Sequence, residues 1–130
     1  MGANSGQSVA CKYYRLDVSN NTAPRDWLLV FNAAFDAFFP TLEATRDEDM
    51  ALGLNASNDN LGSPYYVSFI VYEWLEGSAS IGAGIGLRFG SGVAGGSTAN
   101  RWGDYSASHL DPCDFRTVWL AGQHARSGDW

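Results

Sequence analysis

The sequence predicts an all-β fold with about eight antiparallel strands, on three observations. Short apolar runs recur along the chain with turn residues between them. Fifteen glycines accompany few lysines and glutamates, which disfavours helical bundles. Aromatic residues make up 14% of the chain and apolar residues 45%, so the composition is that of a packed protein.

The length of 130 residues is enough for one domain with a modest core. We expect residues 1–10 to form a flexible N-terminal tail and residues 11–130 to form a single all-β domain. The formal charge of −6 and the absence of a basic run argue against nucleic-acid binding. No apolar segment approaches the roughly 20 residues that span a bilayer, and no signal peptide is recognised.

The first half of the chain predicts four strands. "CKYYRLDVS" (11–19) alternates and is followed by the expected loop "NNTAPRD" (20–26). "WLLVFNAAF" (27–35) favours a strand, with a helix as the alternative because phenylalanines recur at helical spacing. "FFPTLEA" and "DMALGLNAS" flank the charged turn "TRDED" and predict a hairpin.

The second half predicts the remaining strands. "PYYVSFIVYEW" (64–74) is apolar on both faces, so we expect it to be covered on both sides. "SIGAGIGLRFGSGVAGG" lacks the glycine spacing of a phosphate-binding loop and predicts a glycine-spaced strand and loop. "DYSASHLDP" and "FRTVWLAGQ" predict two last strands around a turn at Pro112, Cys113 and Asp114.

The C-terminal run resembles a segment of bacterial secreted β-propeller proteins of the sialidase-like, BNR type. The matching residues are the hexamer R-W-G-D-Y-S (101–106), the pair Asp111-Pro112 and Trp119. Upstream, "YYRLDVS", "FFPTLEATRDEDMALGLNAS" and "GSPYYVSF" look like the preceding blade of that family. His109 and Cys113 depart from the family pattern, and the Asp-box repeat of true sialidases is absent.

The resemblance implies propeller-blade topology, with a small β-barrel or sandwich as the alternative architecture. Propeller blades have four strands, so the chain would supply one complete blade from Phe38 to about Phe89 and a half blade on either side. Unfinished blades predict either a homo-oligomer, in which copies complete one another, or a piece of a larger propeller. The family resemblance also implies a secreted or extracellular protein.

The hexamer supplies the candidate ligand-binding residues Arg101, Asp104 and Tyr105. Asp104 would lie at the mouth of a propeller channel, and Arg101 beside it has the fork geometry that binds a carboxylate. The competing interpretation is that Arg101 and Asp104 pair with each other across a turn. No residue pattern predicts a catalytic group, a metal site or a cofactor.

Other chemistry-bearing residues favour structural roles. His109 and Asp111 share a strand face with Tyr105, but one histidine and one carboxylate are too few for a metal site. "DED" (47–49) lacks the glycine and final glutamate of a calcium-binding loop and predicts a solvated turn. The residues leave open whether Cys11 and Cys113 form a disulfide or stay free. We expect the aromatic residues to fill the space between blades rather than to form sugar-stacking platforms; these are Tyr65, Tyr66, Tyr72, Trp74, Trp102 and Trp119.

Two functions follow as expectations. The first is a non-catalytic binding or structural module of propeller type, possible partners being a glycan or further copies of the chain. The alternative is a fragment of a sialidase-like glycoside hydrolase with Asp104 as one acidic participant. Such an enzyme needs a second carboxylate about 5–10 Å away, and the sequence does not identify one.

Overall fold

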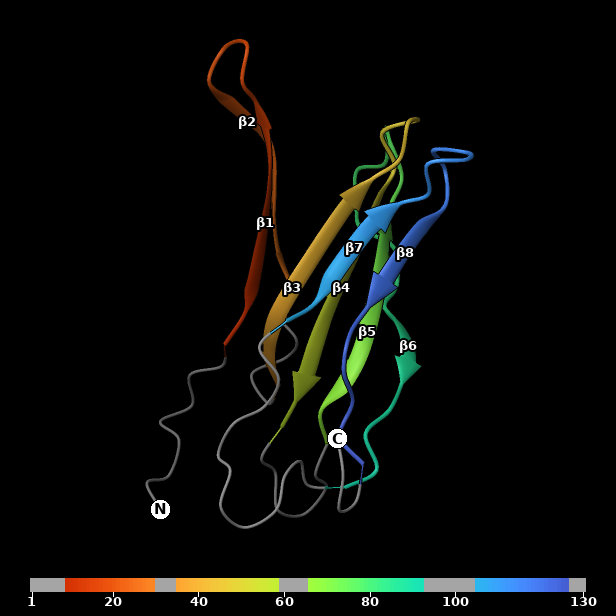
Figure 1. The fold of residues 1–130 in the computed structure, drawn as a ribbon. Helices are drawn as coiled ribbons and strands as arrows, with labels where there is room; N and C mark the ends of the chain where they lie inside the picture. Colours follow the sequence, from red (N-terminus) through yellow and green to blue (C-terminus); the bar gives the residue numbers. More distant parts are fainter. Residues whose placement is uncertain (1–8, 30–34, 59–65, 93–104, 127–130) are drawn as a thin grey trace.

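The computed structural model describes residues 9–29, 35–58, 66–92 and 105–126, and these residues form an all-β fold (Figure 1). The predicted fold class is confirmed. Within the described ranges no helix is long and apolar enough to cross a membrane. The strands are β1 (Cys11–Asp17), β2 (Thr22–Leu29), β3 (Asp36–Ala44), β4 (Met50–Ser57), β5 (Ser68–Trp74), β6 (Ile85–Arg88), β7 (Ala107–Leu110) and β8 (Val118–Ala121).

The strands form three antiparallel sheets. β1 and β2 form a two-stranded sheet, β3 to β6 a four-stranded meander, and β7 and β8 a second two-stranded sheet. Each strand therefore pairs with its neighbour in sequence, as expected for a chain with short connections. The four-stranded sheet runs over residues 36–88 and positions the two hairpins.

The central strands are buried on both faces. In β4, Leu52, Leu54 and Ala56 lie on one face and are fully buried. Asn55, on the other face, is 1% exposed. Because alternate residues of a strand point to opposite sides, burial of both sets means that this strand is covered from both directions. We call the first side the core face and the second the hairpin face.

The β1–β2 sheet contributes to the cover of the core face. Cys11 and Tyr13 are buried in one cluster with the apolar residues of β4 and β5. The Tyr13 hydroxyl donates a hydrogen bond to the Gly53 carbonyl oxygen over 3.1 Å, and burial raises the pKa of Tyr13 well above its usual range. Val9, in the predicted tail, also bonds the sheet, because its carbonyl oxygen accepts the amide of Ala37 over 2.8 Å.

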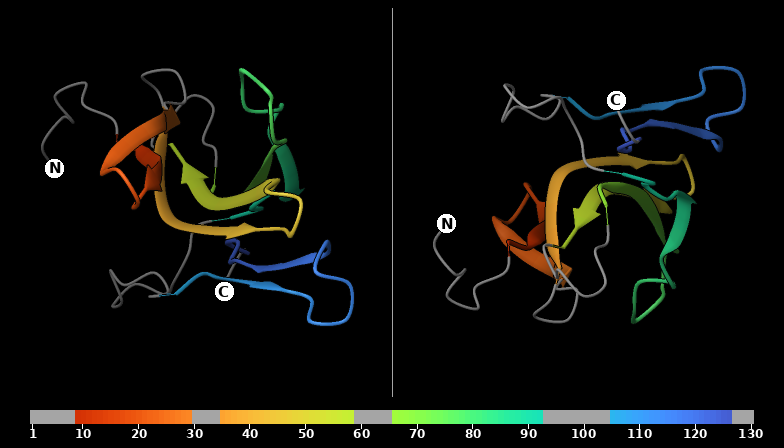
Figure 2. Two further views of the ribbon diagram at one scale, coloured as in Figure 1. Left: turned by 90° about the horizontal axis from the view of Figure 1, so that it is seen from above. Right: turned by 90° about the horizontal axis from the view of Figure 1, so that it is seen from below.

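The β7–β8 sheet lies against the hairpin face, next to β3 (Figure 2). The Thr41 hydroxyl donates to the Ser108 hydroxyl over 2.8 Å, and Ser108 donates to the Leu42 carbonyl over 2.7 Å. The buried Asn55 amide donates to the carbonyl oxygen of Gln123, just after β8. Buried polar groups need such partners, so these bonds fix the position of the hairpin on the sheet.

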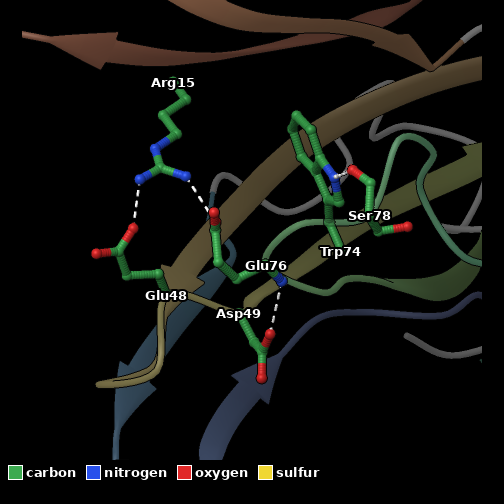
Figure 3. Close-up of polar contacts among 6 residues, drawn as sticks. All are labelled: Arg15, Glu48, Asp49, Trp74, Glu76 and Ser78. Carbon is green, nitrogen blue, oxygen red and sulfur yellow. Dashed lines mark hydrogen bonds and ion pairs between the residues drawn. The ribbon is translucent and has the colours of Figure 1, made fainter.

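Both hairpins also contact the turn between β3 and β4. Arg15 of β1 forms ion pairs with Glu48 of this turn and with Glu76 after β5 (Figure 3). From the other side, Arg116 forms an ion pair with Asp47 over 2.8 Å. Exposed ion pairs of this kind add little stability singly, but together they join the three sheets at one end.

Four hairpin turns that the structure describes, those after β1, β3, β5 and β7, each contain a residue in the left-handed backbone region. Gly77 and Asn21 have φ values of 75° and 54°, which these residue types adopt readily. Glu48 and Phe115 have φ values of 66° and 55°, which are unfavourable for their types. Both contact another sheet, Glu48 through Arg15 and Phe115 through its carbonyl oxygen, which accepts the Arg46 amide.

One predicted loop is wrong. The sequence indicates a loop over residues 20–26, yet β2 begins at Thr22. Asp17 accepts the Ser19 amide, and Asn20 accepts the Thr22 amide, so the turn is already complete at Thr22. Pro24 lies where the β1–β2 register shifts, a position at which a strand tolerates proline. Residues 30–34 of the next predicted strand lie outside the described residues.

Candidate functional site

Two of the three sequence-predicted site residues, Arg101 and Asp104, lie outside the described residues. The third, Tyr105, precedes β7 and is 82% exposed. Exposure then alternates along the chain, with Ala107 and His109 exposed and the residues between them half-buried. Tyr105 therefore belongs to the side of the hairpin that faces away from the four-stranded sheet.

The register of the β7–β8 hairpin completes this outward face. Ala107 pairs with Ala121, and His109 pairs with Trp119, so each pair points the same way. Trp119 is 65% exposed although it is the largest side chain of the hairpin. The alanine pair lies along the strands between Tyr105 and the His109–Trp119 pair and carries only methyl groups. The outward face is defined by Tyr105, Ala107, His109, Trp119 and Ala121.

Asp111 holds the Trp119 ring in place. The Trp119 indole nitrogen donates to one Asp111 carboxylate oxygen over 3.0 Å. The other oxygen accepts the backbone amide of Cys113 over 2.8 Å. The amide of Cys113 and, next, the indole of Trp119 lower the pKa of Asp111. A charged acceptor strengthens both bonds, so an exposed ring is kept in one orientation.

The second carboxylate of this hairpin has a structural role. Asp114 accepts the backbone amide of Arg116 over 2.8 Å, and the hydroxyl and amide of Thr117 over 2.7 and 2.9 Å. Led by the Arg116 amide, these bonds lower the pKa of Asp114 to about 2. Asp111 and Asp114 therefore shape the turn before β8, and both carboxylates have hydrogen-bond partners within the protein.

His109 is bonded within its own strand. Its Nδ1 atom lies 2.6 Å from the Leu110 carbonyl oxygen. The structural role expected for His109 agrees with this contact. Among the residues that the structure describes, no group of three or more His, Cys, Asp or Glu side chains is arranged to hold a metal ion.

The acidic turn over residues 47–49 serves the fold. Asp47 and Glu48 form the ion pairs with Arg116 and Arg15, and an Asp49 carboxylate oxygen accepts the Glu76 amide over 2.7 Å. Beside it, the Trp74 indole donates to the Ser78 carbonyl (Figure 3). Each of the three carboxylates therefore has a protein partner.

The cysteines are both free. Cys11 is buried on the core face and Cys113 is exposed in the β7–β8 turn. Burial raises the pKa of the Cys11 thiol, which makes that thiol a poor nucleophile at neutral pH.

Sequence reasoning considered Trp119 as a sugar-stacking residue but favoured a structural role for it. Of the aromatic residues expected to be packed inside, Trp74 is buried, with 2% exposure, whereas Trp119 is exposed. The sequence signal for this role was the spacing of Asp111 and Trp119 on either side of the turn, which lets the carboxylate reach the ring.

Comparison with protein-family models, with curated proteins and with solved structures finds no match for this chain.

Proposed function

We propose that this chain is a non-catalytic binding module of the β-propeller type, and that its outward face binds a carbohydrate. The observation that carries the proposal is Trp119, whose ring is 65% exposed while its nitrogen is bonded to Asp111. Burying an aromatic side chain stabilises a protein by roughly 1.5–3 kcal/mol. An exposed ring whose orientation is fixed is better suited to contact a ligand than to support the fold.

The chemistry of the outward face supports a sugar. A pyranose ring has an apolar face, which packs on an aromatic ring, and hydroxyl groups at its edge. Here the Trp119 ring, which provides an apolar surface, lies beside His109 and on the same side of the hairpin as Tyr105. The His109 imidazole and the Tyr105 hydroxyl supply hydrogen-bonding groups next to that surface. Among the residues that the structure describes, none on the outward face is a lysine or arginine, so this described part fits a neutral sugar better than a phosphorylated ligand.

The length of the outward face favours an oligosaccharide. Tyr105 and His109 are four residues apart, about 13 Å in an extended chain. A ligand that contacts both Tyr105 and the His109–Trp119 pair must therefore be extended. The structural roles of Asp111 and Asp114 support a binding role for this hairpin rather than acid–base chemistry.

A glycan array tests the proposal. The wild-type protein is expected to bind a set of neutral oligosaccharides, and Trp119→Ala is expected to lower the affinity at least about tenfold, as loss of an aromatic anchor does at binding sites. Tyr14→Ala is the matched control, because Tyr14 is 53% exposed on the other hairpin. Absence of glycan binding by the wild type, or an equal loss in both variants, would contradict the proposal.

A further inference from the structure

The imidazole ring of His109 has a hydrogen-bond partner at one of its two nitrogens. Its Nδ1 atom lies 2.6 Å from the carbonyl oxygen of Leu110, the next residue of β7. Within the part of the chain that the structure describes, the Nε2 atom has no hydrogen-bond partner. The side chain is exposed on the outward face, so Nε2 is available to a molecule that binds there.

The Leu110 carbonyl determines which nitrogen of the neutral ring carries the proton. A carbonyl oxygen only accepts hydrogen bonds, so Nδ1 is the donor in this contact. A neutral imidazole has a single N–H group, and its other nitrogen is an acceptor. His109 in its neutral form is therefore the Nδ1–H tautomer, and Nε2 presents a lone pair.

This acceptor lies beside the Trp119 ring. His109 and Trp119 are directly opposite each other in the register of β7 and β8. Side chains in such cross-strand pairs have Cβ atoms about 4.5–5.5 Å apart. A sugar ring that stacks on the indole has hydroxyl groups around its rim, and those on the β7 side come next to the imidazole.

The two polar residues of the outward face differ in what they accept from a ligand. The Tyr105 hydroxyl both donates and accepts, so it tolerates a donor or an acceptor opposite it. The Trp119 nitrogen is already bonded to Asp111. The neutral His109 ring offers only an acceptor at Nε2. Of the described residues of this face, His109 is therefore the one that requires a donor from the ligand.

We infer that His109 Nε2 accepts a hydrogen bond from a hydroxyl group of the sugar that stacks on Trp119. The inference rests on the proposed carbohydrate binding and adds a selectivity to it. A free sugar hydroxyl donates this bond, whereas a methyl ether at the same position has lone pairs only and would face the lone pair of Nε2. The outward face thus selects neutral sugars with a free hydroxyl there over sugars that are methylated at it.

Affinities for a matched set of oligosaccharides test the inference. The set consists of the neutral oligosaccharide that binds most strongly on the array, with its monodeoxy and mono-O-methyl derivatives. At pH 8, where imidazoles are neutral, we expect one position whose deoxy and methyl derivatives both bind the wild type about two- to tenfold more weakly, the range for one hydrogen bond. In His109→Phe, which keeps a ring and removes the acceptor, the deoxy derivative is expected to bind as well as its parent.

Tyr105→Phe is the control for this comparison. It removes the other hydrogen-bonding group of the outward face, and it is expected to leave the deoxy penalty at the His109 position unchanged. A penalty of equal size in the wild type and His109→Phe, or a methyl ether that binds the wild type as well as the parent, would overturn the inference while carbohydrate binding stands. Absence of any oligosaccharide binding by the wild type would instead overturn the proposed function, and the inference with it.

Nuclear magnetic resonance of nitrogen-15 in the histidine rings gives a second readout, which needs no sugar. The chain has two histidines, so the His109 signals are assigned by their absence in His109→Phe. At pH 8 we expect the Nδ1 signal of His109 to be that of a protonated nitrogen and the Nε2 signal that of an unprotonated one. The opposite pattern would overturn the inference even in a protein that binds oligosaccharides.

Discussion

The indole nitrogen of Trp119 lies 3.0 Å from a carboxylate oxygen of Asp111, and this bond joins the end of β7 to the middle of β8. It closes the turn between them and also fixes the ring that the outward face presents. The same carboxylate thus contributes to the fold and to the candidate site, because Asp111 accepts both the Cys113 amide of the turn and the Trp119 indole.

Replacement of Asp111 by alanine is expected to weaken glycan binding about two- to tenfold. Ordering a side chain on binding costs about 0.5–1.5 kcal/mol of free energy. Because Asp111 already orders the Trp119 ring in the free protein, this cost is not incurred when the glycan binds. The measurement is a titration with the strongest-binding glycan of the array. Asp114→Ala is the control, because Asp114 shapes the same turn without bonding the Trp119 ring. Equal weakening in the two variants would assign the effect to the turn.

Asp114 is expected to stabilise the fold in a pH-dependent manner. Its pKa is lowered to about 2, first by the Arg116 amide, against about 3.9 in an unfolded chain. A lowered folded-state pKa means that the contribution is complete above about pH 4 and is lost as pH falls toward 2. Thermal unfolding of the wild type and Asp114→Asn should differ at pH 7 and converge near pH 2. A difference of constant size down to pH 2 would show that the charge has no part in it.

A methyl group at Gly122 is expected to destabilise the protein by about 1–3 kcal/mol, the usual range for overpacking. A Cβ atom placed there would overlap the ring of Phe69, which belongs to the hairpin face of β5. Chemical denaturation of Gly122→Ala measures the loss.

The double variant Gly122→Ala with Phe69→Leu checks the cause. A smaller side chain at Phe69 makes room for the methyl group, so the two losses should be less than additive. Additive losses would mean that Gly122 is needed for another reason.

Replacement of Asn55 by aspartate is expected to destabilise the protein by at least about 2 kcal/mol at neutral pH. Asn55 is 1% exposed, and its amide donates to the carbonyl oxygens of Ser68 and Gln123. A carboxylate there cannot donate and would face two acceptors. Protonation restores one donor and buried carboxyl groups have raised pKa values, so the loss should shrink between pH 7 and pH 5. A loss that grows on acidification would contradict this account of Asn55.

The sequence predicted the fold class and most strands because local signals agreed with one another. The charged turn over residues 45–49 separates two apolar runs, and β3 and β4 pair across it as expected. In the second run, Leu52 and Leu54 share a face of β4 and are fully buried. The propeller interpretation stays a prediction.

Sequence-based prediction was wrong at the turn before β2, where side-chain hydrogen bonds determine the turn. Proline and asparagine over residues 20–26 indicated a long loop, but Asp17 and Asn20 close a tight turn and the strand resumes at Thr22. Similarly, the aromatic pattern gave no sign that Trp119 is exposed. Exposure depends on which elements lie above a strand, and that is a property of the tertiary arrangement.

The most direct test of the central claim is a titration with the glycan that binds most strongly on the array. Nuclear magnetic resonance monitors the titration on protein whose tryptophans carry an isotope label. The chain has five tryptophans, and the Trp119 indole signal is assigned by its absence in Trp119→Phe. We predict that this signal shifts in a saturable way, while that of the buried Trp74, bonded to Ser78, does not. Saturable binding that leaves the Trp119 signal unchanged would contradict the proposal that the outward face is the binding site.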